Sequence, residues 1–211
     1  MQRKQRQHLF YFLALTGCVF LLISGSYFVY AAMTATDKKA NDFQIGQVET
    51  SLVEIFDDTI TEIEKNQSVK KEVSVKNTGT INQFVRVMIL PEVRAPVEGD
   101  TNEQVLPLVI GKDFVLENMS TSDWQDGGDG YYYYVKEAVA PKKSTSNLFK
   151  SIKLSDSLTQ QYHQTEFSIY LKVETINCAE FTYREAWWQG NIPTSTSLKA
   201  VDDALKTKVE K

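Results

Sequence analysis

The sequence predicts an all-β fold, an antiparallel β-sandwich, from three observations. Apolar and polar residues alternate in short stretches after residue 42, and a period of two is typical of strands with one solvated face. Turn-forming residues separate these stretches, without the regular exchange of strand and helix patterns that marks an α/β protein. Aromatic residues make up 11% of the chain, including ten Tyr and eleven Phe, and they favour pleated, half-buried surfaces.

Eight segments carry the strand pattern. Residues 167–175 alternate most cleanly, whereas residues 84–90 are apolar at nearly every position, which predicts a central strand covered on both faces. Pro91 is expected to end that central strand. In chain order, the predicted strands are residues 43–52 with an interruption near Gly46, 69–76, 84–90, 105–110, 114–116, 131–135, 148–154 and 167–175.

The C-terminal segment, residues 191–211, predicts a short helix. Ser195 or Ser197 is a candidate N-cap for it. Whether the helix docks on the sandwich or frays stays open at the level of sequence. An apolar stripe with helical spacing is formed by Leu198, Val201, Leu205 and Val209.

The N-terminal segment predicts export from the cell. Basic residues at positions 3, 4 and 6 precede 24 uncharged residues, 9–32, as in a secretory signal peptide. Small residues place the expected cleavage between Ala31 and Ala32. The alternative is an uncleaved membrane anchor, because about 20 apolar residues span a bilayer. Either way, the rest of the chain lies outside the cytoplasm, and only this segment meets the membrane.

The expected organisation is a signal peptide or anchor (1–31), a flexible arm (32–42), a β-sandwich domain (43–190) and a helical tail (191–211). Removing residues 1–31 leaves 20 basic and 27 acidic residues, a net charge of −7. This sign argues against nucleic acid as a partner. Cys178 is then the one remaining thiol, and a buried, inert thiol is the expectation. Intermolecular pairing and reactivity are the alternatives.

The residues expected of an enzyme are scarce. Catalytic zinc takes several protein ligands, usually histidines, but His163 is the one histidine after the leader. His163 and Cys178 are candidates for a base and its nucleophile. The interpretation that we favour is a surface histidine and a buried cysteine without a shared role. We therefore predict a non-enzymatic protein without a cofactor.

Two local patterns are candidates for binding. Asp123, Asp126 and Asp129 lie among glycines and are weak calcium candidates, with a simple hairpin turn as the alternative. In the Tyr131–Tyr134 run, alternation sends successive rings to opposite faces, and we expect one pair in the core and the other exposed. The candidate interaction surface comprises Phe43, Tyr132, Tyr134, Trp187 and Trp188, with one of the two tryptophans expected to be exposed.

Four stretches, in this order, resemble the SipW-dependent secreted protein family of Gram-positive bacteria (TasA/camelysin-like), and within it the BsaA-type biofilm matrix subgroup. They are NDFQIGQVETSLVE, VKNTGTINQFVRV, DWQDGGDGYYYYVKEAVAPKKSTSNLFKSIKLS and YREAWW, and they span residues 41–188. APKKST stands where the family usually has a Pro-Gly turn, and the segment after Trp188 extends beyond the family pattern.

The resemblance implies a jelly-roll-like sandwich, processing by a dedicated signal peptidase, and a role in the extracellular matrix. The expected function is an exported structural protein of the cell surface or biofilm matrix, whose partners are other copies of itself or other matrix proteins. A membrane-tethered adhesin or assembly accessory is the alternative. A secreted camelysin-like metalloprotease is the weaker one, because of the single histidine.

Overall fold

The computed structural model describes residues 47–56, 64–97, 102–162 and 165–210, all within one compact unit, Gly46–Lys211. The described residues form two antiparallel sheets. Sheet A has the order β1 (Thr50–Phe56), β2 (Ser68–Asn77), β8 (Phe149–Leu154) and β5 (Phe114–Glu117). Sheet B contains β3 (Gln83–Pro96), β4 (Glu103–Leu106), β6 (Trp124–Asp126), β7 (Tyr131–Tyr134) and β9 (Glu166–Asn177). The predicted β-rich, antiparallel architecture is therefore confirmed.

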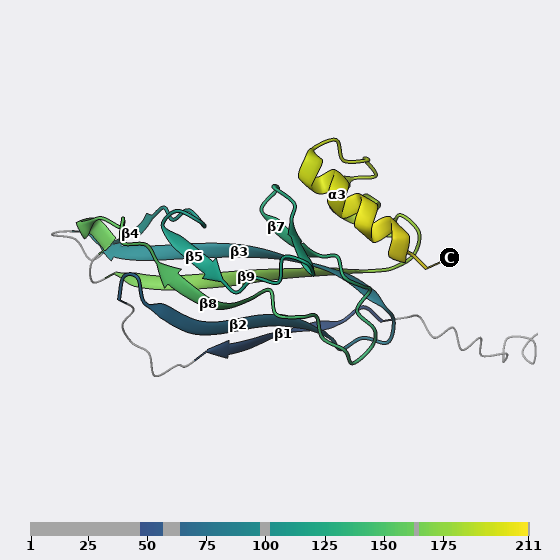
Figure 1. The fold of residues 1–211 in the computed structure, drawn as a ribbon, viewed down its shortest axis with the longest axis horizontal. Helices are drawn as coiled ribbons and strands as arrows, with labels where there is room; N and C mark the ends of the chain where they lie inside the picture. Colours follow the sequence, from purple (N-terminus) through teal and green to yellow (C-terminus); the bar gives the residue numbers. More distant parts are fainter. Residues whose placement is uncertain (1–46, 57–63, 98–101, 163–164, 211) are drawn as a thin grey trace, which may run out of the picture. The chain divides into compact units, whose positions relative to one another are not determined.

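The long strand β3 organises sheet B. Strand β9 pairs with β3 from Gln83 to Arg94, so β9 occupies one whole edge of β3. Strands β7 and β4 share the opposite edge, where β7 faces residues 86–88 and β4 faces residues 93–96. Strand β6 continues the sheet beyond β7. Figure 1 shows β3 and β9 side by side along their length.

Pro91 does not end the central strand, and this prediction was wrong. Gln83 exchanges both backbone hydrogen bonds with Val139, so its N–H and C=O point away from β9. Backbone groups alternate in direction along a strand, and the β3–β9 register is unbroken. The nitrogen of Pro91 therefore also points away from β9, into the gap between β7 and β4, where a missing N–H costs no ladder hydrogen bond.

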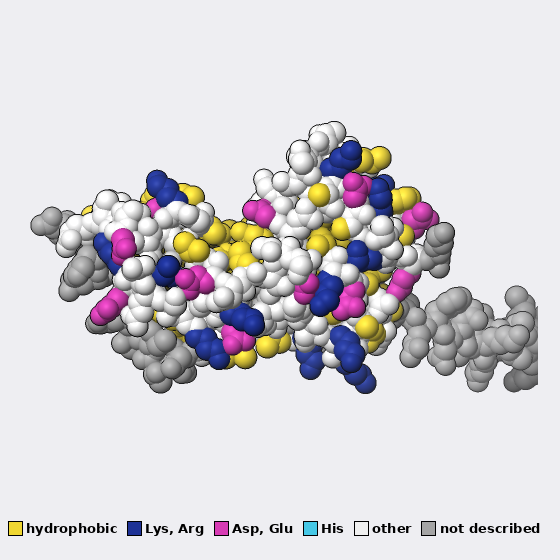
Figure 2. All heavy atoms as spheres, viewed as in Figure 1, with side chains coloured by type: hydrophobic (Ala, Val, Ile, Leu, Met, Phe, Trp, Pro, Cys, Tyr) yellow, Lys and Arg dark blue, Asp and Glu magenta, His cyan; other side chains and the backbone are white. Residues whose placement is uncertain are grey.

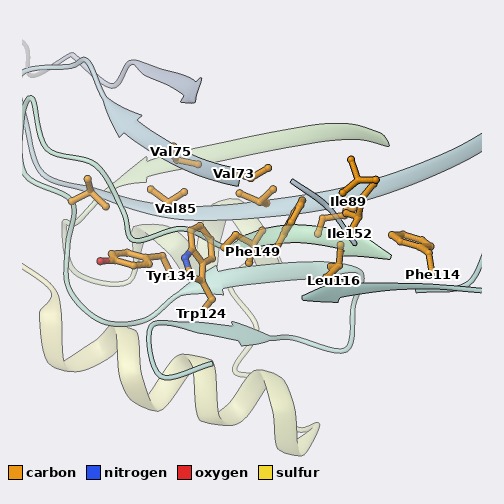
Figure 3. Close-up of a cluster of buried hydrophobic side chains, with 14 residues drawn as sticks. Val73, Val75, Val85, Ile89, Phe114, Leu116, Trp124, Tyr134, Phe149 and Ile152 are labelled. Carbon is orange, nitrogen blue, oxygen red and sulfur yellow. The ribbon is translucent and has the colours of Figure 1, made fainter. Parts of the chain in front are cut away.

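A common apolar core lies between the two sheets. Its buried side chains come from β2, β5 and β8 of sheet A, from β3, β6 and β7 of sheet B, and from Val139 and Leu148 in the segment between β7 and β8. Figure 3 shows these side chains, among them Val73, Phe149 and Tyr134, gathered between the strands. Alternation on β2 and β3 explains the inward set, because every second residue of a strand faces the same side.

A second core lies on the other face of sheet B, beneath a helical cap formed by α2 (Thr182–Trp188) and α3 (Thr196–Leu205). Figure 1 shows α3 beside β7, on the side away from β1 and β2. Val201 and Leu205 are 0% and 1% exposed, so the predicted C-terminal helix docks. Val209 lies beyond the helix, after the turn η2 (Lys206–Lys208), but still packs against this core.

Other boundaries differ from the predictions. Strand β1 begins at Thr50, and residues 47–49 lie outside it; positions 43–46 fall outside the described residues. Strand β4 ends at Leu106 instead of residue 110. Strand β6, the short 3-10 helix η1 (Gln160–Tyr162) and helix α2 were not predicted. Helix α2 is short, and left-handed residues, Phe181 and Gln189, flank it, so its sequence carries no long helical period.

Candidate interaction surface

The tyrosine run in β7 is buried on both of its faces. Tyr134 packs against Trp124 between the sheets, with ring centroids 5.1 Å apart. Tyr133 points to the other face, beneath the helical cap, and is 0% exposed. Alternation therefore separates the rings as predicted, but the helical cap covers the face that a plain sandwich would leave in solvent.

The prediction that Tyr132 and Tyr134 form an exposed pair was wrong. Tyr134 is 2% exposed, and Tyr132 is half-buried against the core between the sheets. These two side chains face sheet A because their neighbours Tyr131 and Tyr133 face the cap. Both pack in the core between the sheets, and Tyr134 is too deeply buried to meet a partner.

Trp187 and Trp188 attach the helical cap to sheet B. Both are half-buried, and their rings lie 5.6 and 6.0 Å from that of Tyr133. Trp188 Nε1 also donates a hydrogen bond to the Tyr133 hydroxyl at 3.3 Å. Neither tryptophan is exposed, so the predicted exposed ring is not found. Aromatic pairs in such tilted and edge-to-face arrangements stabilise a contact beyond the area that they bury.

The Tyr133 hydroxyl connects the cap, the sheet and the β6–β7 turn. It donates a hydrogen bond to Asp129 Oδ2 at 2.7 Å and accepts one from Arg86 Nη1 at 3.2 Å. Burial, followed by the hydrogen bond to Asp129, raises the pKa of Tyr133 to about 12. The Arg86 guanidinium lies 3.9 Å from the Tyr131 ring centroid and 4.9 Å from that of Trp187, a cation–π geometry.

Glu174 on β9 balances the charge of Arg86. Arg86 Nε donates to it at 2.8 Å, the Tyr131 hydroxyl at 2.9 Å, and Lys172 forms an ion pair at 2.7 Å. Burial works to raise the pKa of Glu174, but the hydrogen bonds from Lys172, Arg86 and Tyr131 outweigh it and lower this pKa to about 2. The Glu174 carboxylate is therefore charged in the folded protein at neutral pH.

This lowered pKa predicts a loss of stability in acid. Because the pKa of Glu174 falls from an ordinary 4.5 to about 2 on folding, its contribution is complete above pH 4.5 and disappears as the pH falls toward 2. The Glu174→Gln variant should be less stable at pH 7 and show a shallower fall in this window. Urea unfolding at a series of pH values measures both effects. Glu137→Gln, an exposed change outside the strands, is the control. Identical slopes for Glu174→Gln and the unmodified protein would contradict the prediction.

The acidic residues of the β6–β7 region stabilise their own loop. Asp126 accepts a hydrogen bond from the Gly128 N–H at 2.8 Å, and Asp129 accepts one from the Tyr131 N–H at 3.1 Å. Asp123 pairs with Lys136 at 3.3 Å. In the part of the chain that the structure describes, no group of three or more His, Cys, Asp or Glu side chains is arranged to hold a metal ion. The three carboxylates are thus not brought together as the calcium site considered above.

Cys178 is buried, as expected, with 1% exposure and a free thiol. Burial, and secondarily the charge of Glu210, raise its pKa to about 12. The nucleophilic thiolate is therefore not formed at neutral pH. His163, Phe43 and the cleavage position at Ala31 and Ala32 lie outside the described residues, so their predicted roles stay predictions.

Two long strand edges are unpaired within the described ranges: the outer edge of β1 in sheet A and that of β9 in sheet B. Exposed apolar side chains lie on both strands. Ile55 and Phe56 on β1 are 51% and 41% exposed, and Tyr170 on β9 is 53% exposed, opposite the 45% exposed Leu90. Figure 2 shows further hydrophobic side chains at the surface between β5 and the helical cap. No sequence pattern marked these edges, because edge status depends on which strands become neighbours.

Neither a scan against models of protein families nor a search of the curated proteins finds a match for this chain. Among the helices of the described ranges, none is both long and apolar enough to span a membrane. The fold and its surfaces define a mostly antiparallel β protein with two sheets around a common core, a helical cap on sheet B and two long strand edges that no described segment pairs with.

Proposed function

We propose that this protein is an exported structural subunit of the cell surface or biofilm matrix that assembles into fibres through its sheet edges and N-terminal arm. The single observation that carries the proposal is the pair of unpaired edges, β1 and β9, within the described ranges. An unpaired edge accepts an additional strand through main-chain hydrogen bonds. The predicted leader and the family resemblance support the same function, and the resemblance also supports a jelly-roll-like arrangement of the sandwich.

The arm, residues 32–42, is the proposed donated strand, together with Phe43. It directly precedes the sandwich, so an arm that pairs with the edge of a neighbouring copy would link copies in series. Such heterologous contacts produce open filaments when the rotation between subunits does not close a ring. Signal peptidase acts before assembly in this scheme, because cleavage between Ala31 and Ala32 frees the arm.

Deletion of residues 32–42 should abolish filament growth. The secreted amount of each variant is measured first by immunoblot, so that failed export is not taken for failed assembly, and filaments are then viewed by negative-stain electron microscopy. Replacing the arm by a glycine-serine segment of equal length separates the role of its sequence from that of its length. Normal filaments from the deleted protein would reject the role of the arm.

A membrane-tethered adhesin or assembly accessory is the second candidate, favoured by the 24 uncharged residues of the leader. N-terminal sequencing of the extracellular form separates the two functions. A start at Ala32 supports the secreted subunit, and a start at Met1 supports the tethered protein.

A further inference from the structure

The outer edge of β9 presents a row of backbone hydrogen-bonding groups. Odd-numbered residues of β3 point their N–H and C=O away from β9, as the Gln83–Val139 bonds show. Each of them faces an odd-numbered residue of β9, such as Ile169 opposite Pro91. These are non-hydrogen-bonded pairs, in which both residues direct their backbone groups outward. The N–H and C=O groups of Phe167, Ile169, Leu171 and Val173 therefore point to the free edge.

This edge is open in two respects. No backbone partner from the described ranges occupies it. The same four residues direct their side chains toward the core between the sheets, yet each remains only partly buried, whereas Val85, Val87 and Val93 on neighbouring β3 are at most 3% exposed. A long edge with apolar side chains and free backbone groups is a strong candidate for strand pairing.

The charges of β9 favour a second copy of the same strand as the occupant. If two β9 strands pair antiparallel with Ile169 opposite Ile169, Phe167 faces Leu171 of the second copy, and Glu166 faces Lys172 of the second copy. Two-fold symmetry makes this ion pair twice. Glu166 is exposed and takes part in no ion pair within the described ranges; Arg94, opposite it on β3, pairs with Glu92 and Glu103 instead. Lys172 pairs with Glu174 of its own chain, but its side chain is 56% exposed and is free on its solvent side to contact Glu166 of the second copy.

Neighbouring registers are less favourable. Placing Tyr170 opposite itself sets Glu166 against Glu174, and placing Lys172 opposite itself sets two like charges together; both arrangements are destabilising. A centre at Leu171 leaves Glu166 opposite Ile176, without a charged partner. A centre at Val173 matches Lys172 with Glu174, but these two residues already pair within each chain, and Ile176 in that half of β9 packs against the core beneath the helical cap.

We propose that β9 pairs with β9 of a second copy of this chain, antiparallel and about a two-fold axis at Ile169, to join two copies of sheet B into one continuous sheet. This inference rests on the proposed function, because it names the partner of one of the two open edges. The exposed Tyr170 would then lie directly opposite Ser168 of the second copy, on the outer face of the joined sheet. The paired β9 edges form a closed dimer, and the β1 edges remain free for growth.

Cysteine cross-linking in the full chain tests the register. Ser168→Cys and Tyr170→Cys chains are co-expressed, each with Cys18→Ser, and treated with a mild oxidant. Opposite residues in a non-hydrogen-bonded pair have Cα atoms about 4.5 Å apart, within the range for a disulfide. The mixture should give a disulfide-linked dimer on a non-reducing gel. Each variant alone should give no linked dimer, because its two cysteines then lie diagonally across the strand pair, about 7–8 Å apart.

Charge reversal provides an independent test of the same pairing. Glu166→Lys and Lys172→Glu, each added to both reporter chains, should lower the yield of the linked dimer by about tenfold, and the double exchange should restore it. Glu137→Lys, an exposed change outside β9, is the matched control and should leave the yield unchanged. Circular dichroism and the melting temperature confirm that each variant is folded.

Folded reporter chains that give no linked dimer, or that link equally well alone and mixed, would overturn the β9 pairing. Linked dimers that never form filaments would support the pairing and count against the proposed function. Filaments without the β9 link would leave the proposed function in place through another edge and reject the inference.

Discussion

Replacing Tyr133 by alanine is expected to lower the free energy of unfolding by about 3–5 kcal/mol, the cost of removing a fully buried aromatic side chain. Tyr133 is 0% exposed, and its ring contacts both tryptophans of α2. The variant loses these contacts, leaves a cavity between sheet and cap, and removes the acceptor for Arg86 and Trp188. Urea unfolding of residues 46–211, the compact unit, measures the effect.

Tyr133→Phe separates the effect of the ring from that of its hydroxyl group, and Tyr170→Ala is a control for the loss of an exposed ring. Tyr133→Phe keeps the ring but removes the hydroxyl that donates to Asp129 Oδ2 and accepts from Trp188 Nε1, and should cost about 1–3 kcal/mol. Tyr170→Ala removes a ring that is 53% exposed and should change stability by about 0.5 kcal/mol or less. Equal effects of the Tyr133→Ala and Tyr170→Ala changes would show that the cap does not pack on β7 as described.

Replacing Asp202 by alanine is expected to cost about 3–5 kcal/mol, because it breaks a buried ion pair and leaves the other charge unpaired. Asp202 accepts two hydrogen bonds from Arg184, from Nε and Nη2 at 2.7 Å each, and a third from the Tyr183 hydroxyl at 2.8 Å. The side chains of Arg184 and Asp202 are only 14% and 5% exposed. These bonds join α3 to α2, so their loss should loosen the cap.

The adjacent residue provides the control. Asp203 pairs with Lys206 on the surface, where both side chains are about half exposed, and such pairs contribute about 0–1 kcal/mol. Asp203→Ala should therefore have a small effect. A double-mutant cycle with Arg184→Met tests the assignment further: the double change should cost less than the sum of the single changes. Additive effects would contradict a direct pair.

The strands that could be predicted are those whose signal is local. Strands β2, β7, β8 and β9 lie within a few residues of their predicted positions, because alternation is written in consecutive residues. The error at Pro91 has a different origin. A proline ends a strand only where its nitrogen faces a partner, and the direction of that nitrogen depends on the register with β9.

In the candidate site, too, local features could be predicted from the sequence, whereas contacts between distant segments could not. Alternation separated the rings of the Tyr131–Tyr134 run correctly, but the choice of the exposed pair required knowledge of α2, a helix without a long periodic pattern. Trp187 and Trp188 were predicted to belong to an interaction surface, but the ring that both of them contact is Tyr133 of the same chain. The Arg86–Glu174 pair and the Arg184–Asp202 pair could not be found from sequence. The two residues of the first pair meet across neighbouring strands, and those of the second meet across two helices.

By itself, the sequence determined the β-rich antiparallel character of this protein, the turns between its strands, the amphipathic C-terminal helix and the expectation that Cys178 is buried. These features depend on residues close together in the chain. Only the tertiary structure decided that the cap covers the outer face of β7 and that no described segment pairs with the outer edge of β9. Exposure of a face or an edge depends on which distant segments pack beside it, and no local pattern records that choice.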